Sequence, residues 1–196
     1  MKMNHHSILE STQRINVIGT SGSGKSFFSQ QLSSLLGVSH IEIDAIFWGP
    51  NWYWPSDEEF FHKLKQELKL ESWILDGNYT RTIPIKWEAV KIVIWIDYSF
   101  PRTLFQSVRR AIIRAWSKKE LWPGTGNRES FKKSFFSKDS IILWSVKNYW
   151  KNKRKYESMM LKKEYGHIEF VRLRSPKESS IYINSLNQLL LAREAP

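Results

Sequence analysis

Short apolar runs along the chain alternate with longer segments in which apolar residues recur every three or four positions. The short runs predict strands at residues 14–18, 40–44, 73–76, 91–97 and 167–173. The longer segments predict a helix after the first, second, fourth and fifth of these runs, and a long helix at about 137–164. Because strands that alternate with helices are typical of a parallel sheet covered on both faces, the pattern predicts an α/β fold.

Capping residues mark where two of the helices begin. Ser56 with Glu59, and Ser175 with Glu178, match the pattern of a capping box, in which each residue bonds the other's backbone amide. A third helix is predicted to begin at Ser99 and to carry an apolar face made of Leu104, Phe105, Val108 and Ile112. The next segment, 117–136, contains proline and glycines and is predicted to be a loop or a lid.

Composition narrows the class of protein. The 196 residues are 41% hydrophobic and include no cysteine, which excludes a disordered chain, disulfides, thiolate metal sites and a cysteine nucleophile. The five histidines lack the spacing of a zinc site. No run of about 18 apolar residues is present, so no membrane span is expected. The polar N-terminus lacks an apolar signal region, and the expected location is therefore the cytoplasm.

The net charge of +11 is concentrated in one stretch. Residues 102–163 hold 17 Lys and Arg against 4 Asp and Glu, whereas the rest of the chain is close to neutral. Such a stretch suits nucleic acid, phosphorylated metabolites or an anionic membrane, or it is the solvated face of a long helix. Composition alone leaves these alternatives open.

The strongest motif follows the first predicted strand. The residues are Gly19, Thr20, Ser21, Gly22, Ser23, Gly24, Lys25 and Ser26, and they match the phosphate-binding loop pattern G-x-x-x-x-G-K-[ST]. The glycines let backbone amides turn toward phosphate oxygens, and the start of a helix attracts negative charge. Lys25 is expected to reach the β- and γ-phosphates, Ser26 to bind Mg²⁺, and Phe27 to lie against the nucleotide. The motif predicts binding of ATP or GTP.

Three aspartates lie where predicted strands end, namely Asp44, Asp76 and Asp97. The carboxyl ends of parallel strands face the ligand crevice in an open sheet. Carboxylates there suit Mg²⁺ binding, with Asp76 and Asp97 as candidates beside Ser26, or accept a proton from an acceptor hydroxyl. The alternative for each is an ordinary turn or capping residue.

Arginines downstream suit phosphoryl transfer, which spreads negative charge over the transferred oxygens. Arg110 and Arg114 are four residues apart and share one helix face, while Arg128 lies in the segment predicted as a lid. Bidentate cations stabilise such charge, and a closing lid excludes water. Arg109, beside them, fits a basic surface equally well.

These features resemble the nucleoside-monophosphate kinase group of P-loop proteins, which includes adenylate, shikimate and gluconate kinases. The segment 73–81 (WILDGNYTR) resembles the adenylate kinase pattern of an aspartate and glycine followed by Phe-Pro-Arg, with Asn78-Tyr79 in place of Phe-Pro. Segments 40–50 (HIEIDAIFWGP), 76–79 (DGNY), 126–129 (GNRE), 140–144 (SIILW) and 172–175 (RLRS) resemble the small P-loop proteins known as DNA topology modulation proteins. Together the matches cover about residues 14–178.

The resemblance implies one domain over residues 1–196, with a five-stranded parallel sheet in the order 2-3-1-4-5, flanked by helices in a three-layer arrangement. It implies an acceptor-binding region at about 45–72 and a lid at about 117–136. Its implied site residues are Asp44 and Asp76 for the acceptor, Arg81 for an acceptor phosphate, Arg128 in the lid and Arg174 near the nucleobase.

Several tryptophans follow the second predicted strand and are either a stacking platform or the packing of a small subdomain. Trp48 is the strongest candidate for acceptor binding because it follows Asp44 closely. Two functions stay open. One is a kinase that uses ATP and Mg²⁺ to phosphorylate a nucleotide, nucleoside or other hydroxyl compound. The other is an ATP-dependent factor that binds nucleic acid through residues 102–163.

Overall fold

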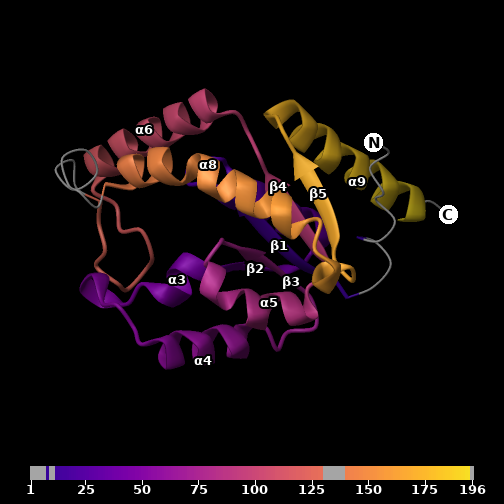
Figure 1. The fold of residues 1–196 in the computed structure, drawn as a ribbon, viewed down its shortest axis with the longest axis horizontal. Helices are drawn as coiled ribbons and strands as arrows, with labels where there is room; N and C mark the ends of the chain where they lie inside the picture. The colour runs from indigo at the N-terminus through magenta and orange to yellow at the C-terminus, as the bar shows by residue number, and fades with distance from the viewer. Residues whose placement is uncertain (1–7, 9–11, 130–139, 195–196) are drawn as a thin grey trace.

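A five-stranded, all-parallel sheet forms the centre of the molecule, with the strand order β2-β3-β1-β4-β5 (Figure 1). The computed structural model describes Ile8, residues 12–129 and residues 140–194. Its strands are β1 (Arg14–Gly19), β2 (Ser39–Glu42), β3 (Trp73–Asp76), β4 (Ile92–Ile96) and β5 (Glu169–Leu173). The sheet order and the parallel pairing confirm the fold predicted from the sequence.

Helices cover both faces of the sheet (Figure 1). The α-helices are α2 (Lys25–Leu36), α3 (Ile43–Phe47), α4 (Asp57–Glu67), α5 (Ile83–Ala89), α6 (Phe100–Ser117), α8 (Ile141–Met159) and α9 (Pro176–Glu194). Three short 3₁₀ helices lie at Pro50–Trp52, Thr80–Thr82 and Lys163–Tyr165. In the part of the chain that the structure describes, no helix is long and apolar enough to span a membrane.

The alternation of side chains along β4 divides the core into two clusters. Ile92, Ile94 and Ile96 point to the face covered by α2 and α9. Val93 and Trp95 point to the opposite face, which α4, α5 and α8 cover. Because each such buried side chain contributes about 1.5–3 kcal/mol of transfer free energy, packing on both faces holds β4 in register.

The predicted capping box at the start of α4 is confirmed. The amide of Glu59 donates to Ser56 Oγ at 3.2 Å, and the amide of Ser56 donates to the Glu59 carboxylate at 3.0 Å. The second box is only half formed. Glu178 N–H bonds Ser175 Oγ, but the Glu178 carboxylate accepts from the amide of Arg174 instead of Ser175.

The predicted apolar face of α6 is wrong. The residues that α6 buries are the small Thr103, Ser107 and Ala111, whereas Phe105 is 68% exposed. The reason is the neighbour, because this face of α6 lies directly on the loop between β1 and α2. A closely approaching backbone leaves room only for small side chains.

Candidate active site

The loop between β1 and α2, residues 19–26, has the conformation that its glycines permit. Gly22 and Gly24 have φ of +82° and +90°, in the left-handed region that favours glycine. A Cβ at Gly22 would also lie 2.1 Å from Ser107 Oγ and 2.7 Å from the Thr103 carbonyl oxygen. The loop is therefore closed on one side by α6. Because its N-cap is Gly24, which has no side chain to bond them, the first amides of α2 are left for another acceptor.

Lys25 and Asp76 meet beside this loop. Lys25 Nζ lies 3.5 Å from Asp76 Oδ1, and both side chains are largely buried. Within the described residues, Asp76 Oδ1 is a buried oxygen that accepts no hydrogen bond. Ser26 follows Lys25 in the first turn of α2 and is partly exposed. A carboxylate oxygen without a donor and a nearby hydroxyl are ligand types that suit Mg²⁺, so these residues fit the cation that the motif implies.

Asn78 joins the end of β3 to the start of the loop. Its Oδ1 accepts from the Gly19 amide at 3.0 Å, and its Nδ2 donates to the Gly19 carbonyl at 2.7 Å. The side chain therefore satisfies both backbone groups of the first loop residue. Asn78 belongs to the segment 73–81, which carries a family resemblance, but no role was predicted for it from the sequence.

Asp44 pairs with Tyr79, a residue for which no role was predicted from the sequence. The Tyr79 hydroxyl donates to Asp44 Oδ1 at 2.8 Å. Burial, and next the Asp44 carboxylate, raise the pKa of Tyr79, so the hydroxyl stays a neutral donor. The predicted strand 40–44 is too long: β2 ends at Glu42, and Asp44 lies in the first turn of α3. The carboxylate still lies beside the segment that follows β3.

The arginines of α6 have different surroundings. Arg110 Nη2 donates to Ser21 Oγ at 2.6 Å, so its guanidinium lies on the phosphate-binding loop. Burial and then the charge of Arg114 lower the pKa of Arg110, and the carboxylates of Glu129, Asp44 and Asp76 oppose this shift. These charges therefore lie within electrostatic reach of one another.

The other two predicted arginines, Arg114 and Arg128, have partners outside the phosphate-binding loop. Arg114 forms an ion pair with Glu129 at 2.9 Å. Arg128 is exposed, and its backbone pairs with that of Glu120 in an isolated antiparallel β-bridge. Of the predicted lid, residues 118–129 are described and contain no helix, and residues 130–136 lie outside the described residues.

The described part of the predicted lid is bonded to the predicted acceptor-binding region. Asn127 Oδ1 accepts from the Trp52 amide at 2.7 Å, and Asn127 Nδ2 donates to the Gly49 carbonyl at 3.0 Å. The Asn51 amide bonds the carbonyl of Thr125 at 2.9 Å. Asn127 is fully buried by these contacts. The two segments therefore contact each other beside α3 (Figure 1).

Asp97 lies in an ion-pair network instead of an open carboxylate site. Its Oδ2 accepts from Arg172 Nη2 at 2.6 Å and lies 3.6 Å from Lys153 Nζ. Arg172 also bonds Glu157 and lies over the ring of Trp95 at 4.3 Å. Since cations already surround Asp97, we leave it out of the magnesium site proposed below.

Arg81 and Trp48 belong to an aromatic cluster on the acceptor side. Arg81 forms an ion pair with Asp57 at 2.7 Å, and its guanidinium lies 5.0 Å from the ring centre of Phe47. Trp48 packs edge-on against Phe47 and Trp54, with ring centres 4.9 and 5.5 Å apart. These contacts favour the packing role for Trp48 and leave Arg81 already paired.

Two predicted nucleotide contacts lie at the surface. Phe27, the residue after the loop, is 67% exposed. Arg174 is exposed at the carboxyl end of β5, where its amide bonds the Glu178 carboxylate. Neither position conflicts with a nucleotide contact.

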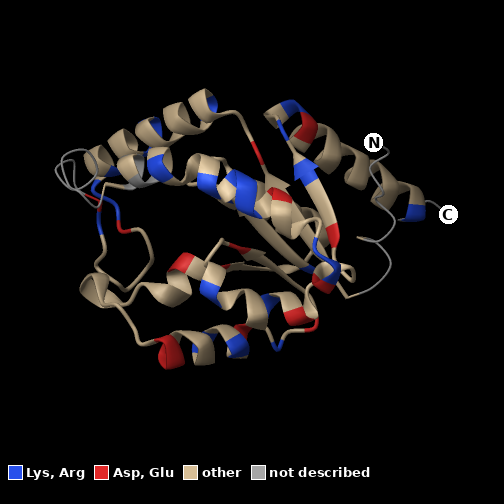
Figure 2. Ribbon diagram, in the orientation of Figure 1, with Lys and Arg blue, Asp and Glu red and all other residues tan. Residues whose placement is uncertain are grey.

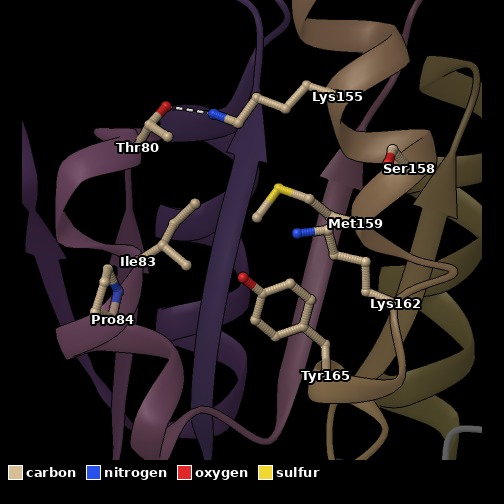
Figure 3. A pocket seen from close by; sticks show the side chains of 8 residues that line it. All are labelled: Thr80, Ile83, Pro84, Lys155, Ser158, Met159, Lys162 and Tyr165. Carbon is tan, nitrogen blue, oxygen red and sulfur yellow. Dashed lines mark hydrogen bonds between the residues drawn. The ribbon is translucent and has the colours of Figure 1, made fainter.

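A groove of about 430 Å³ lies between α5 and α8 (Figure 3). Ile83 and Pro84 line one side, and Ser158 and Met159 line the other. At one end Lys155 Nζ donates to Thr80 Oγ1. No residue of the phosphate-binding loop lines this groove, so it is separate from the candidate site.

Comparison with known proteins identifies the fold. No family model matches the chain, and no curated protein matches its sequence. Among solved structures, the chain is similar to shikimate kinase from Acinetobacter baumannii in complex with shikimate, with a TM-score of 0.55 and 14% identity over 97% of this chain and 99% of that one. An unliganded sugar kinase from Janibacter sp. gives a TM-score of 0.45 and 14% identity, over 92% and 93%. The five-stranded sheet and its flanking helices therefore form the P-loop NTPase fold seen in shikimate kinase.

Proposed function

We propose that this protein is a kinase that transfers the γ-phosphoryl group of ATP to a small acceptor. The observation that carries the proposal is the convergence of Lys25, Asp76 and Arg110 on the phosphate-binding loop. Each lies on a different element, α2, β3 or α6, and the loop itself has the glycine conformation that phosphate binding requires. The P-loop kinase fold supports the same reaction class.

The roles follow from the charges. The loop amides and Lys25 hold the β- and γ-phosphates, and Arg110 stabilises the negative charge that develops on the transferred group. Ser26 and Asp76 would hold Mg²⁺, which neutralises phosphate charge when it is bound. Because the transition state of phosphoryl transfer is loose, positioning of the acceptor matters more than a strong base.

Asp44 is the residue proposed to position the acceptor hydroxyl. Its Oδ1 accepts from Tyr79, and its carboxylate lies within electrostatic reach of Arg110. In the proposed arrangement, an acceptor oxygen that bonds Asp44 lies on the same side as the arginine. The predicted acceptor region at about 45–72 and the described lid residues 118–129 border this side in the proposal.

The substitution Asp44→Asn is expected to lower kcat/KM for the acceptor about 100-fold. The reason is that an amide lacks the negative charge of the carboxylate, which attracts the proton of the acceptor hydroxyl. Binding of Mg-ATP, measured by calorimetry, is expected to stay within about twofold of the wild type, since Asp44 is not part of the loop. Glu88→Gln, which changes an exposed carboxylate on α5 outside the predicted acceptor region, is the matched control. Equal losses of nucleotide affinity and of activity would contradict the role.

The experiment that tests the function is ADP release from Mg-ATP in the presence of nucleotides, nucleosides, sugars and small hydroxy acids. A rise in ADP release with one acceptor class, lost in Lys25→Ala, supports the kinase and names its substrate class. Release that no acceptor stimulates, across the whole panel, argues against it. The acceptor class follows from this measurement.

A second candidate function rests on a basic stripe along α8, made of Lys147, Lys151 and Arg154. These exposed cations recur at helical spacing, and Trp150, which lies between them in the sequence, is exposed as well. Figure 2 shows several Lys and Arg positions, in blue, along α8. Cations with an interleaved aromatic ring suit a nucleic-acid strand. Charge reversal at all three positions is expected to abolish salt-sensitive DNA or RNA binding if this function holds. Equal binding by the variant would reject it.

A further inference from the structure

Lys86 is a lysine of α5 that is fully buried. Its Nζ donates to the carbonyls of Gly77 and Asn78, at 3.0 and 2.6 Å. Among the described residues, no carboxylate lies within ion-pair distance of it. Burial, then the charge of Lys155, lower the pKa of Lys86 to about 7, while Asp76 acts in the opposite direction. A buried amine with only carbonyl partners is costly, so its position calls for an explanation.

The carbonyls that Lys86 bonds belong to a turn with little freedom. Gly77 has φ of +144°, and a Cβ there would lie 1.9 Å from Ile43 Cγ2. Its carbonyl also accepts from Asn16 Nδ2 at 3.2 Å, and Asn16 Oδ1 accepts from Trp87 Nε1 at 2.9 Å. Two adjacent residues of α5 therefore support the end of β3 through separate polar contacts. An apolar residue in place of Lys86 would leave the Asn78 carbonyl without the donor described here.

The turn that Lys86 supports is hydrogen-bonded to the phosphate-binding loop through the side chain of Asn78. The backbone of Asn78 is bonded to Lys86, and its side chain bonds both backbone groups of Gly19. The path from α5 to the first residue of the loop therefore consists of two consecutive sets of hydrogen bonds. The next residue, Tyr79, bonds Asp44, so the same turn also borders the acceptor side.

We propose that Lys86 is a positioning residue that holds the Gly77–Asn78 turn, so that Asn78 fixes Gly19 and thereby the phosphate-binding loop. Lys86 acts on nucleotide affinity through Asn78 and does not contact the nucleotide. The inference rests on the proposed function, because the nucleotide is the ligand that reports the position of the loop.

The test is a double-mutant cycle read out as the Kd for Mg-ADP, which needs neither acceptor nor phosphoryl transfer. Lys86→Met and Asn78→Ala are each expected to raise the Kd about tenfold, the scale of one lost buried hydrogen bond. The Kd of the double variant is expected to be no higher than that of the single variant with the higher Kd, because both substitutions interrupt the same contacts from Lys86 through Asn78 to Gly19. Effects that multiply would show that Lys86 does not act through Asn78.

Trp87→Phe is the matched control for stability. Trp87 lies beside Lys86 on α5, and the substitution removes its indole donor to Asn16 of β1 but leaves the contacts of Lys86 and Asn78 in place. It is expected to lower Tm while changing the Kd by less than about twofold. If Lys86→Met likewise lowers Tm and leaves the Kd unchanged, Lys86 only stabilises the fold and the proposal is wrong.

Amide hydrogen exchange separates this inference from the proposed function. Should the wild-type protein bind no Mg-ADP, the function fails, yet exchange in the peptide covering residues 14–27 still reports the loop. Asn78→Ala and Lys86→Met are expected to speed exchange there more than Trp87→Phe does. Unchanged exchange in both variants overturns the inference. Lys86→Gln, which keeps a neutral donor at this position, carries the test if Lys86→Met does not fold: faster exchange in residues 14–27 supports the inference, and unchanged exchange overturns it.

Discussion

Lys25→Ala is expected to lower kcat for phosphoryl transfer about 10³-fold, which is the scale of losing one cation that neutralises transition-state charge. Lys25 lies in the first turn of α2, and its ammonium is 3.5 Å from Asp76. The side chain is therefore directed to the place where β3 ends beside the loop. Lys86 is not available to replace its charge, since its ammonium is bonded to the carbonyls of Gly77 and Asn78.

The measurement is ADP formation with the acceptor class found in the panel, together with calorimetric titration of Mg-ATP. The Kd for Mg-ATP is expected to rise about tenfold, which is less than the fall in kcat. The reason is that the lysine stabilises the transition state, in which negative charge develops, more than it stabilises the bound nucleotide. Lys91→Ala, an exposed lysine before β4, is the control that should keep full activity. Retention of a tenth or more of kcat in Lys25→Ala would remove Lys25 from the chemistry.

The fold could be predicted because each strand has a distinct local pattern. The strand Trp73–Asp76 is found to the residue, since Gly77 ends it with a backbone conformation that glycine favours. The predicted second strand runs too far because Ile41 and Ile43 continue the alternation, although Ile43 already begins α3. Both are buried, so hydrophobicity alone does not separate a strand from the helix that follows it.

The candidate site was predictable only where one motif holds its residues together. The phosphate-binding loop is continuous in sequence, and its glycines mark positions where the backbone adopts a conformation that favours glycine. Asp97, by contrast, directly follows β4, but the sequence does not show that parallel pairing brings Arg172 beside it. The same limit applies to Asn78, whose partner Gly19 is 59 residues away.

Lys86 shows why buried polar residues escape a sequence pattern. On a short helix a lysine is normally assigned to the solvent face, and its neighbours Ile85 and Trp87 do not contradict that assignment. Its burial follows from the turn after β3, which offers two carbonyls close to α5. Only the tertiary arrangement supplies that information. For the same reason the small buried residues of α6 were not predicted, since their neighbour is a loop from another part of the chain.

Arg110→Gln is expected to lower kcat about 100-fold while the Kd for Mg-ATP changes less than about threefold. The guanidinium lies on Ser21 of the loop, and the carboxylates of Asp44 and Asp76 are close enough to affect the pKa of Arg110. A neutral amide removes its charge from the developing transition state but keeps a donor for Ser21. Arg110→Lys, which keeps the charge without the planar fork, is expected to recover part of the rate.

Two further variants decide whether Arg110 acts on the transferred group or only supports the loop. Arg109→Gln changes the adjacent, exposed arginine and is expected to leave kcat unchanged. Ser21→Ala removes the hydroxyl that Arg110 bonds but leaves the guanidinium beside the loop. If Ser21→Ala lowers kcat as strongly as Arg110→Gln, the arginine works by holding Ser21. If only Arg110→Gln does so, and Arg110→Lys partly restores the rate, the charge of Arg110 stabilises the phosphoryl group during its transfer.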